Sequence, residues 1–315
     1  MFTRIVRRVV AFALSALAAA VLAFLLLAVL PGDVARAQLG IDASDADVAR
    51  LRAQLGLDRP LLVRLGDWLG GLLHGDLGTS YATQTPVAPQ VLDAAQVTLI
   101  LVLAGLLVAW AIALVLGTLA GMRPHRPEGV VAGLVAQVGI SVPSFLAGLL
   151  LVIVFAVRLG WLPAGGWTAP ADGVSDFLAH LALPALALGL VHGSVLARWL
   201  RGSVRDVAHE DFLRTARAVG LTAGQAMWRH GMRSALVPVI AASGVEFASL
   251  VIGAVVIEQV FVIPGLGSLL LRAVGTRDLA MIQAIVLVVV VLVLLVNLLV
   301  DVLQAIVDPR LRERA

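Results

Sequence analysis

Residues 210–220 read EDFLRTARAVG and lie between two long apolar segments of the chain. Phe212, Ala216 and Val219 recur at helical spacing, so the stretch predicts a short helix with one apolar face. Gly220 follows at the position where many helices end, because glycine adopts the left-handed C′ conformation with little strain. The pattern therefore predicts a short helix that stops abruptly before the chain turns.

A second helical piece is predicted after the turn. Thr222 is a favourable N-cap for the segment AGQAMWRHGMRSAL, and Arg214 and Arg217 lie beside the apolar face of the first piece. An aromatic side chain among small residues and positive charge suits docking into a groove of another protein. The same pattern suits an amphipathic helix on the inner leaflet, with its arginines on lipid phosphates. These residues alone are compatible with both interpretations.

The composition is that of a membrane protein. Of the 315 residues, 60% are hydrophobic and 14% are charged, and the mean hydropathy is +1.01. A soluble domain of this size could not bury so much apolar surface. All 23 basic residues are arginine, so the lysine of a phosphate-binding loop is absent and any ATP hydrolysis must occur on another chain.

Other classes of function find little support. The chain has no cysteine, which excludes disulfides and thiolate chemistry. The net charge of +3 does not favour nucleic-acid binding. No catalytic or metal-binding motif is recognisable: the pair His209-Glu210, for example, lacks the second histidine of H-E-x-x-H. We therefore expect no catalytic residues, no metal site and no enzyme activity.

Six stretches have the ~20 largely apolar residues that a transmembrane helix needs. They are residues 9–30, 97–121, 129–157, 181–200, 236–261 and 281–307. The first runs for 22 residues without a charge, longer than the ~7–15 residues of a signal-peptide core. We therefore expect it to remain as a membrane span.

The arginines predict the orientation of these spans. With the amino terminus inside, 15 of the 23 arginines fall on the inner side. The loop 31–96 exceeds the ~60 residues to which the positive-inside rule applies, and without it the outer side holds three arginines. Both termini and the loop 201–234 are therefore expected to be cytoplasmic.

The spans divide the chain into four predicted parts. These are an N-terminal cytoplasmic arm with the first span (1–30), an extracytoplasmic loop with short helices (31–96), a core of five spans that includes the loop 201–234 (97–307), and a cytoplasmic tail (308–315). Within the extracytoplasmic loop, DADVARLRAQLGL and RPLLVRLGDWLGGLL have helical spacing. We expect them to form a small helical extension on the outer membrane surface.

Ionisable side chains inside the spans are costly and are therefore candidate functional groups. Glu246 has no neutralising residue one turn away on its own helix, and His192 lies deep in the fourth span. Each could line a translocation pathway or be a satisfied structural group. Glu258, near the outer end of the fifth span, is expected to reach water. Asn297 and Asp301 share a face of the sixth span that suits packing against a neighbouring helix.

Residues 210–239, EDFLRTARAVGLTAGQAMWRHGMRSALVPV, resemble the EAA loop of ABC-type importer permeases, specifically the dipeptide, oligopeptide and nickel branch. Eight further segments occur in the order of that branch. They are RIVRR (4–8), PGD (31–33), LGLDRP (55–60), HGDLGTS (74–80), GISVPSF (139–145), HLALPAL (180–186), VIEQVFVIPGLGSLL (256–270) and NLLVDVLQAIVDPRLR (297–312). In place of the Glu-Ala-Ala of the general consensus, this chain has Arg214-Thr215-Ala216, so no acidic coupling role is expected at position 214.

The resemblance implies a type I ABC importer permease: an all-α protein of the bacterial inner membrane with six transmembrane helices. It implies a pore shared with a second permease subunit, of a different chain, together with two ATPase subunits and an extracytoplasmic binding protein. ATP and magnesium would be bound by the ATPase subunits, and this chain would carry no cofactor. The residues implied to couple it to the ATPase are Phe212, Arg214, Thr215, Ala216, Arg217, Ala218, Gly220 and Leu221.

The resemblance implies inward transport of di- or oligopeptides, with nickel or a metal chelate as the alternative cargo. Two other classes of membrane protein remain open from the residues alone. One is a proton-coupled secondary transporter with Glu246 and His192 as a proton relay, and the other is a scaffold that transports nothing. No inverted internal repeat of the secondary-transporter kind is evident in the sequence.

Overall fold

The computed structural model describes residues 2–29, 34–39 and 42–307, so the predicted tail 308–315 lies outside the described residues. In the described part all regular secondary structure is helical, apart from an isolated bridge between Thr79 and Pro86. Five of the described helices are long and apolar enough to cross a membrane, and a bent helix pair makes a sixth candidate. The predicted all-α membrane fold is therefore confirmed, whereas the cytoplasmic placement of the termini stays a prediction.

The chain divides into two compact units, which we describe separately. Unit 1 comprises Met1–Thr98 and Pro264–Leu294, and unit 2 comprises Leu99–Ile263 and Leu295–Ala315. The helices of unit 1 are α1 (Phe2–Val29), α2 (Val34–Leu39), α3 (Asp45–Gln54), α4 (Leu61–Leu73), α13 (Leu266–Gly275) and the first parts of α5 (Val87–Ile112) and α14 (Leu279–Val307).

Unit 1 is organised around a buried aspartate. Asp278 precedes α14, and its carboxylate accepts hydrogen bonds from the backbone N–H of Met281, at 3.3 Å, and of Tyr81, at 3.1 Å. The hydroxyl of Ser80 donates to the same carboxylate. Asp278 thus caps α14 and ties it to the HGDLGTS segment. Burial raises the pKa of the Tyr81 phenol, an effect that Arg64 opposes and Asp278 reinforces.

The loop between the first and second predicted spans has the two helices that its sequence predicts. Helix α3 begins at the N-cap Ser44, whose hydroxyl accepts from the backbone of Asp47, and the chain turns at Gly56 with a φ of +66°. Helix α4 covers the second amphipathic segment. Their position on a membrane surface stays a prediction.

Unit 2 is built around α9 (Val174–Ala208), a helix of 35 residues. The other helices of the unit include the ends of α5 and α14. The remaining elements are η1 (Ala113–Gly117), α6 (Thr118–Met122), α7 (Pro127–Ser141), α8 (Ser144–Leu151), η2 (Val152–Arg158), η3 (Pro170–Asp172), α10 (Asp211–Ala218), α11 (Ala223–Ala226), η4 (Met227–Gly231) and α12 (Met232–Val260). Of these, η3 is a 3₁₀ turn, and η1, η2 and η4 are π-helical.

Glycines hold α9 close to its neighbours in unit 2. A Cβ added at Gly193 would lie 2.9 Å from Ala109 Cα of α5, and one at Gly189 would lie 2.4 Å from a methyl of Val108. Gly117 of η1 meets α9 in the same way, since its Cβ would lie 2.8 Å from the carbonyl oxygen of Ala197. Any larger residue would push the helices apart, so these small residues fix the packing.

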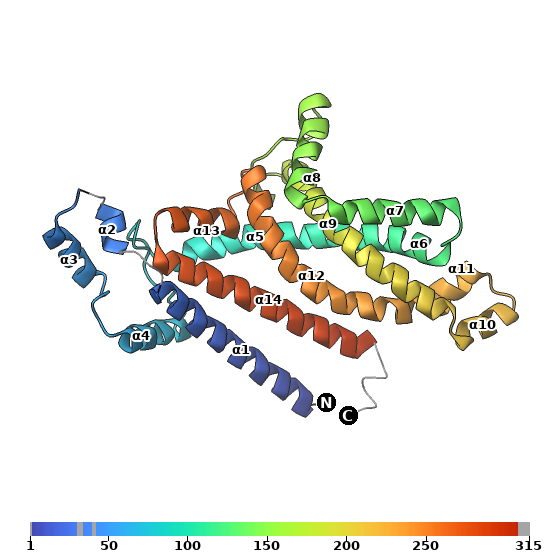
Figure 1. Cartoon of the computed structure of the whole chain (residues 1–315), viewed down its shortest axis with the longest axis horizontal. Helices are drawn as coiled ribbons and strands as arrows, with labels where there is room; N and C mark the ends of the chain where they lie inside the picture. The colour runs from blue at the N-terminus through green and yellow to red at the C-terminus, as the bar shows by residue number, and fades with distance from the viewer. Residues whose placement is uncertain (1, 30–33, 40–41, 308–315) are drawn as a thin grey trace. The chain divides into compact units, whose positions relative to one another are not determined.

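The third predicted span, residues 129–157, is not straight. Helix α7 ends at Ser141, and the next helical stretch, Ser144–Arg158, runs at 105° to it, as Figure 1 shows for α7 and α8. The break falls at Pro143, which lacks an N–H donor, and Val142 before it is extended, with φ −93° and ψ 123°. The pair is therefore one broken span or a re-entrant segment.

The expectation that Glu258 reaches water is wrong, because its side chain is completely buried. The end of α12 is held by two backbone hydrogen bonds: the Ile263 N–H donates to the carbonyl of Glu258 at 2.8 Å, and the Gly166 N–H donates to the carbonyl of Phe261 at 2.7 Å. The expected packing of Asn297 agrees with the structure. Its Oδ1 would lie 2.7 Å from a Cβ at Gly244 of α12.

Candidate functional site

The segment 210–220 forms α10, with Glu210 as an extended N-cap residue and Asp211 in the first turn. An acidic residue there is favourable because the N-terminus of a helix carries partial positive charge. Gly220 has a φ of +99°, which confirms the predicted left-handed helix end. Its N–H donates to the carbonyl of Arg217 at 3.0 Å.

The second helical piece begins as predicted at Thr222. The Thr222 hydroxyl accepts from the backbone of Gln225 at 3.3 Å, and the Gln225 side chain accepts from the backbone of Thr222 at 3.0 Å. This reciprocal capping box fixes the start of α11. The spacing of Thr222 and Gln225 could have predicted the pair from sequence.

The segment outside the long helices is shorter than the predicted loop 201–234. It comprises residues 209–222, including α10, and is called the hairpin below. Helix α9 continues to Ala208, and α11, η4 and α12 follow one another without a break, so the candidate span runs from Ala223 to Val260. Figure 1 shows α10 and α11 beyond the end of α9. The turn and short helix are therefore attached directly to two long helices of the unit.

Leu213 anchors α10 to unit 2. This side chain is buried, in a cluster with Met227, Ala226 and Val204. A Cβ added at Gly231 would lie 3.1 Å from a methyl of Leu213 and 2.6 Å from the sulfur of Met227. Gly231 thus makes room for the leucine, and sequence analysis missed both residues of this contact.

The outward face of α10 is apolar at both ends. Phe212 is exposed, and Val219 exposes 76% of its surface. Ala216, predicted to share this face, is half-buried because it packs partly on the cluster around Leu213, and Leu221 packs there as well. The remaining predicted coupling residues are exposed: Arg214, Thr215, Arg217, Ala218 and Gly220.

The structure brings together the two candidate pathway residues. His192 of α9 and Glu246 of α12 form a hydrogen bond of 2.7 Å between Nδ1 and Oε2. Their side chains are 11% and 13% exposed. Glu246 therefore finds on another helix the partner that its own helix lacks. Such a pair reduces the cost of holding a carboxylate inside the spans.

The imidazole also lies against the backbone of α12. A Cβ added at Gly253 would be 3.7 Å from His192 Nε2 and 3.9 Å from the hydroxyl of Ser144, the first residue of α8. The pair is thus close to the point where the third span breaks. Discontinuous helices at membrane depth are tolerated where protein or a cavity surrounds them.

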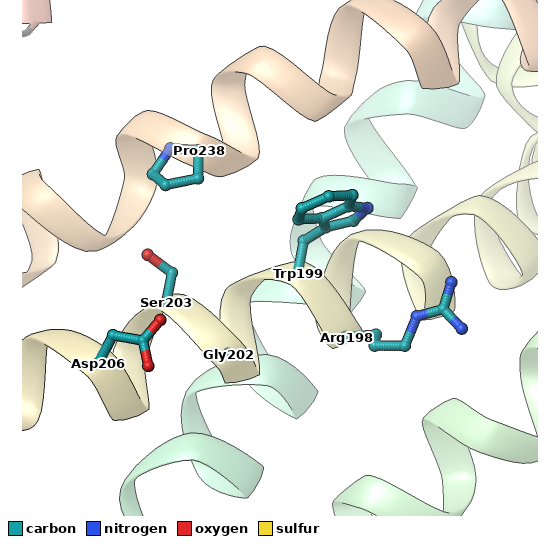
Figure 2. Close-up of a pocket in the computed structure, with 6 residues that line it drawn as sticks. All are labelled: Arg198, Trp199, Gly202, Ser203, Asp206 and Pro238. Atoms are coloured by element: carbon teal, nitrogen blue, oxygen red, sulfur yellow. The ribbon is translucent and has the colours of Figure 1, made fainter.

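A groove of about 390 Å³ lies between α9 and α12, and its lining residues are closer in the chain to the hairpin than His192 and Glu246 are. Figure 2 shows Trp199 and Ser203 on α9 and Pro238 on the facing helix α12, with the Ser203 hydroxyl directed toward Pro238. Arg198, Gly202 and Asp206 complete its lining. The groove is therefore lined by the same two helices that carry His192 and Glu246.

Two family descriptions match the chain. Residues 113–313 match the binding-protein-dependent transport system inner membrane component, and residues 1–102 match the N-terminal part of the corresponding membrane component. Together they account for nearly the whole chain, including α10 and the His192–Glu246 pair.

Relatives are similar along nearly their full length. A Brucella abortus protein named as a peptide transport system permease is 40% identical over 294 residues, which are 93% of each chain. The glutathione transport system permease GsiC of Salmonella typhimurium is 38% identical over 312 residues, or 99% of each chain.

Solved structures share the fold. An amino acid ABC transporter crystallised with histidines aligns with a TM-score of 0.52 at 18% identity, covering 69% of this chain and 94% of that chain. The inward-facing MetNI methionine ABC transporter aligns with a TM-score of 0.54, also at 18% identity, covering 69% and 96%.

The sequence similarity excludes the secondary-transporter and scaffold alternatives, and it makes the protein a transporter subunit rather than an enzyme. Multi-pass insertion into the bacterial inner membrane follows from the same family and from the candidate spans. The chain belongs to the binding-protein-dependent transport system inner membrane components and is a permease subunit of an ABC importer of the peptide and oligopeptide branch.

Proposed function

We propose that this permease carries di- or oligopeptides inward across the bacterial inner membrane. The observation that carries the proposal is the similarity, over at least 93% of each chain, to permeases named for peptide and glutathione transport. Glutathione is itself a tripeptide, so both names describe short peptides. This common chemistry favours a peptide cargo over nickel or a metal chelate.

We propose further that α10 seats in a groove of a cytoplasmic ATPase subunit. A helix with charged flanks and an outward Phe212 and Val219 offers apolar anchors for such a groove. Leu213 and the capped turn at Thr222 fix α10 to α9 and α12, so displacement of α10 would move both long helices. ATP and magnesium would be bound by the ATPase subunits.

In this proposal His192 and Glu246 line the translocation pathway. They join α9 to α12, the two helices that extend directly from the hairpin. Movement of α10 would therefore be transmitted to the pair. Its side chains are 11% and 13% exposed, and in a moved state the carboxylate and imidazole could contact the polar backbone of a passing peptide.

The complete transporter would contain a second permease subunit of a different chain, two ATPase subunits and an extracytoplasmic binding protein. The excess of inner arginines supports placing the hairpin and both termini in the cytoplasm. The binding protein would then deliver cargo on the side of the extension 31–96.

Uptake by the reconstituted complex tests the cargo. Vesicles containing the permease pair, the ATPase subunits and the binding protein would be supplied with labelled dipeptide, labelled glutathione or ⁶³Ni²⁺, with ATP inside or absent. We expect ATP-dependent uptake of at least one peptide. ATP-dependent uptake of nickel alone would overturn the peptide assignment.

A further inference from the structure

Helix α4 (Leu61–Leu73) has a continuous apolar stripe that no other described residue covers fully. At roughly 100° per residue, Leu62, Gly66, Leu69 and Leu73 fall on one side of the helix. Leu62 exposes 78% of its surface and Leu73 exposes 87%. Exposed leucines at both ends of one stripe are unusual for a surface in contact with water.

The side of α4 away from this stripe is polar. Asp67 forms an ion pair of 2.7 Å with Arg59, and both side chains are more than half exposed. Arg64 lies on the neighbouring part of the same side. The helix therefore has separate apolar and charged sides, as helices at a membrane surface do.

A third side of α4 packs on α1, a candidate membrane span. The ring of Trp68 lies 5.6 Å from the ring of Phe24, measured between centroids. The guanidinium carbon of Arg64 lies 6.0 Å from the centroid of the same phenylalanine ring. These contacts place α4 at the level of Phe24 along α1.

That level can be located relative to the membrane. The apolar stretch of α1 runs from Val10 to Ala28, so Phe24 lies four residues before its end. At 1.5 Å per residue this is about 6 Å inside the apolar stretch. Interfacial helices bury their apolar faces to about 5–10 Å in the boundary between headgroups and acyl chains. Leu22 and Leu26 of α1, at the same level, are also exposed.

We propose that α4 is an interfacial helix whose stripe, Leu62 to Leu73, inserts among the acyl chains of the leaflet in which α1 ends. The stripe is exposed at the level at which Leu22 and Leu26 of α1 are also exposed, while Asp67 and Arg59 remain in water. Lipid is thus the partner of this surface, and the membrane holds α4 at a fixed height beside α1.

Spin-label accessibility tests the proposal. The chain has no native cysteine, so Leu62→Cys, Leu73→Cys and the control Asp67→Cys each give a single labelled site. The full chain, assembled with its partner subunits, would be reconstituted into phosphatidylethanolamine–phosphatidylglycerol vesicles. Collisions of each label with oxygen, which concentrates in lipid, would be compared with collisions with nickel-EDDA, which stays in water.

We expect oxygen collisions to exceed nickel-EDDA collisions at positions 62 and 73, and the order to reverse at position 67. The ratio of oxygen to nickel-EDDA collisions rises with depth in the bilayer, and it should place labels 62 and 73 near the headgroup end of the acyl chains. Dominant nickel-EDDA collisions at 62 and 73 would overturn the proposal. Exclusion of both reagents there would also overturn it, because a protein partner would then cover the stripe.

Discussion

Replacing Gly220 changes the backbone of the hairpin without changing its packing. The residue has a φ of +99°, and no atom lies within 4 Å of a Cβ added to it. The effect of Gly220→Ala or Gly220→Val therefore comes from backbone conformation alone. The matched control is Gly275→Ala, because Gly275 also has open space around it but no positive φ.

The expected loss of ATPase affinity follows from the left-handed backbone conformation of Gly220. A residue with a Cβ pays roughly 1–2 kcal/mol there, which is a factor of about 5–30 between the native hairpin and its alternatives. If only the native hairpin docks, the apparent affinity for the ATPase falls by up to that factor. Asparagine tolerates the left-handed region better than alanine, so Gly220→Asn should lie between glycine and alanine.

The assay measures the affinity of the detergent-solubilised permease pair for the ATPase subunit by titration. ATP-driven uptake is then measured in vesicles. Insertion and binding-protein delivery should survive, because the change lies outside the spans. Affinity should decrease in the order glycine, asparagine, alanine and valine, with Gly275→Ala unaffected. Equal ATPase affinity and uptake for all four residues at position 220 would refute the conformational reasoning.

Three further predictions address topology, the membrane pair and helix packing. An impermeant thiol reagent added to intact cells should label Ser175→Cys at once and Ala218→Cys only after permeabilisation; the reverse pattern would invert the proposed orientation. Glu246→Ala leaves the imidazole of His192 without its hydrogen-bond acceptor, which costs about 1–3 kcal/mol of stability. This variant should slow peptide uptake more than Glu246→Gln does. Unchanged uptake with either variant, over several peptides and pH values, would remove the pathway role. Gly193→Ala should destabilise the solubilised protein by about 1–3 kcal/mol, as measured by thermal unfolding, because its Cβ would lie 2.9 Å from α5. Gly202→Ala, on the same helix but with open space around it, should leave the stability unchanged. Equal stabilities of the two variants would contradict the packing account.

Local chemistry made much of the hairpin predictable. A glycine after a helical run and a threonine before the next run specify their own backbone conformations, and both predictions hold at Gly220 and Thr222. Membrane spans were predictable for a similar reason, since an apolar stretch of sufficient length is a property of consecutive residues.

Contacts between distant segments were not predictable in the same way. Glu246 and His192 were separate candidates because 54 positions separate them in the chain, and only the packing of α9 on α12 joins them. Ala216 was assigned wholly to the outward face because helical spacing cannot show that Leu213 draws the same side of α10 toward the core. Glu258 was expected in water because the sequence does not show that Gly166, far earlier in the chain, bonds to Phe261 at the end of α12.

The central claim is that α10 contacts an ATPase, and photo-cross-linking from Val219 tests it most directly. Val219→Cys would carry a benzophenone in the assembled transporter, and cross-linked peptides would be identified by mass spectrometry. The control is Val174→Cys, also exposed but at the other end of the 35-residue helix α9, about 50 Å away along its axis. The account predicts adducts between position 219 and a subunit with a phosphate-binding loop, and none from position 174. Adducts of position 219 with lipid alone, in a transporter that hydrolyses ATP, would contradict it.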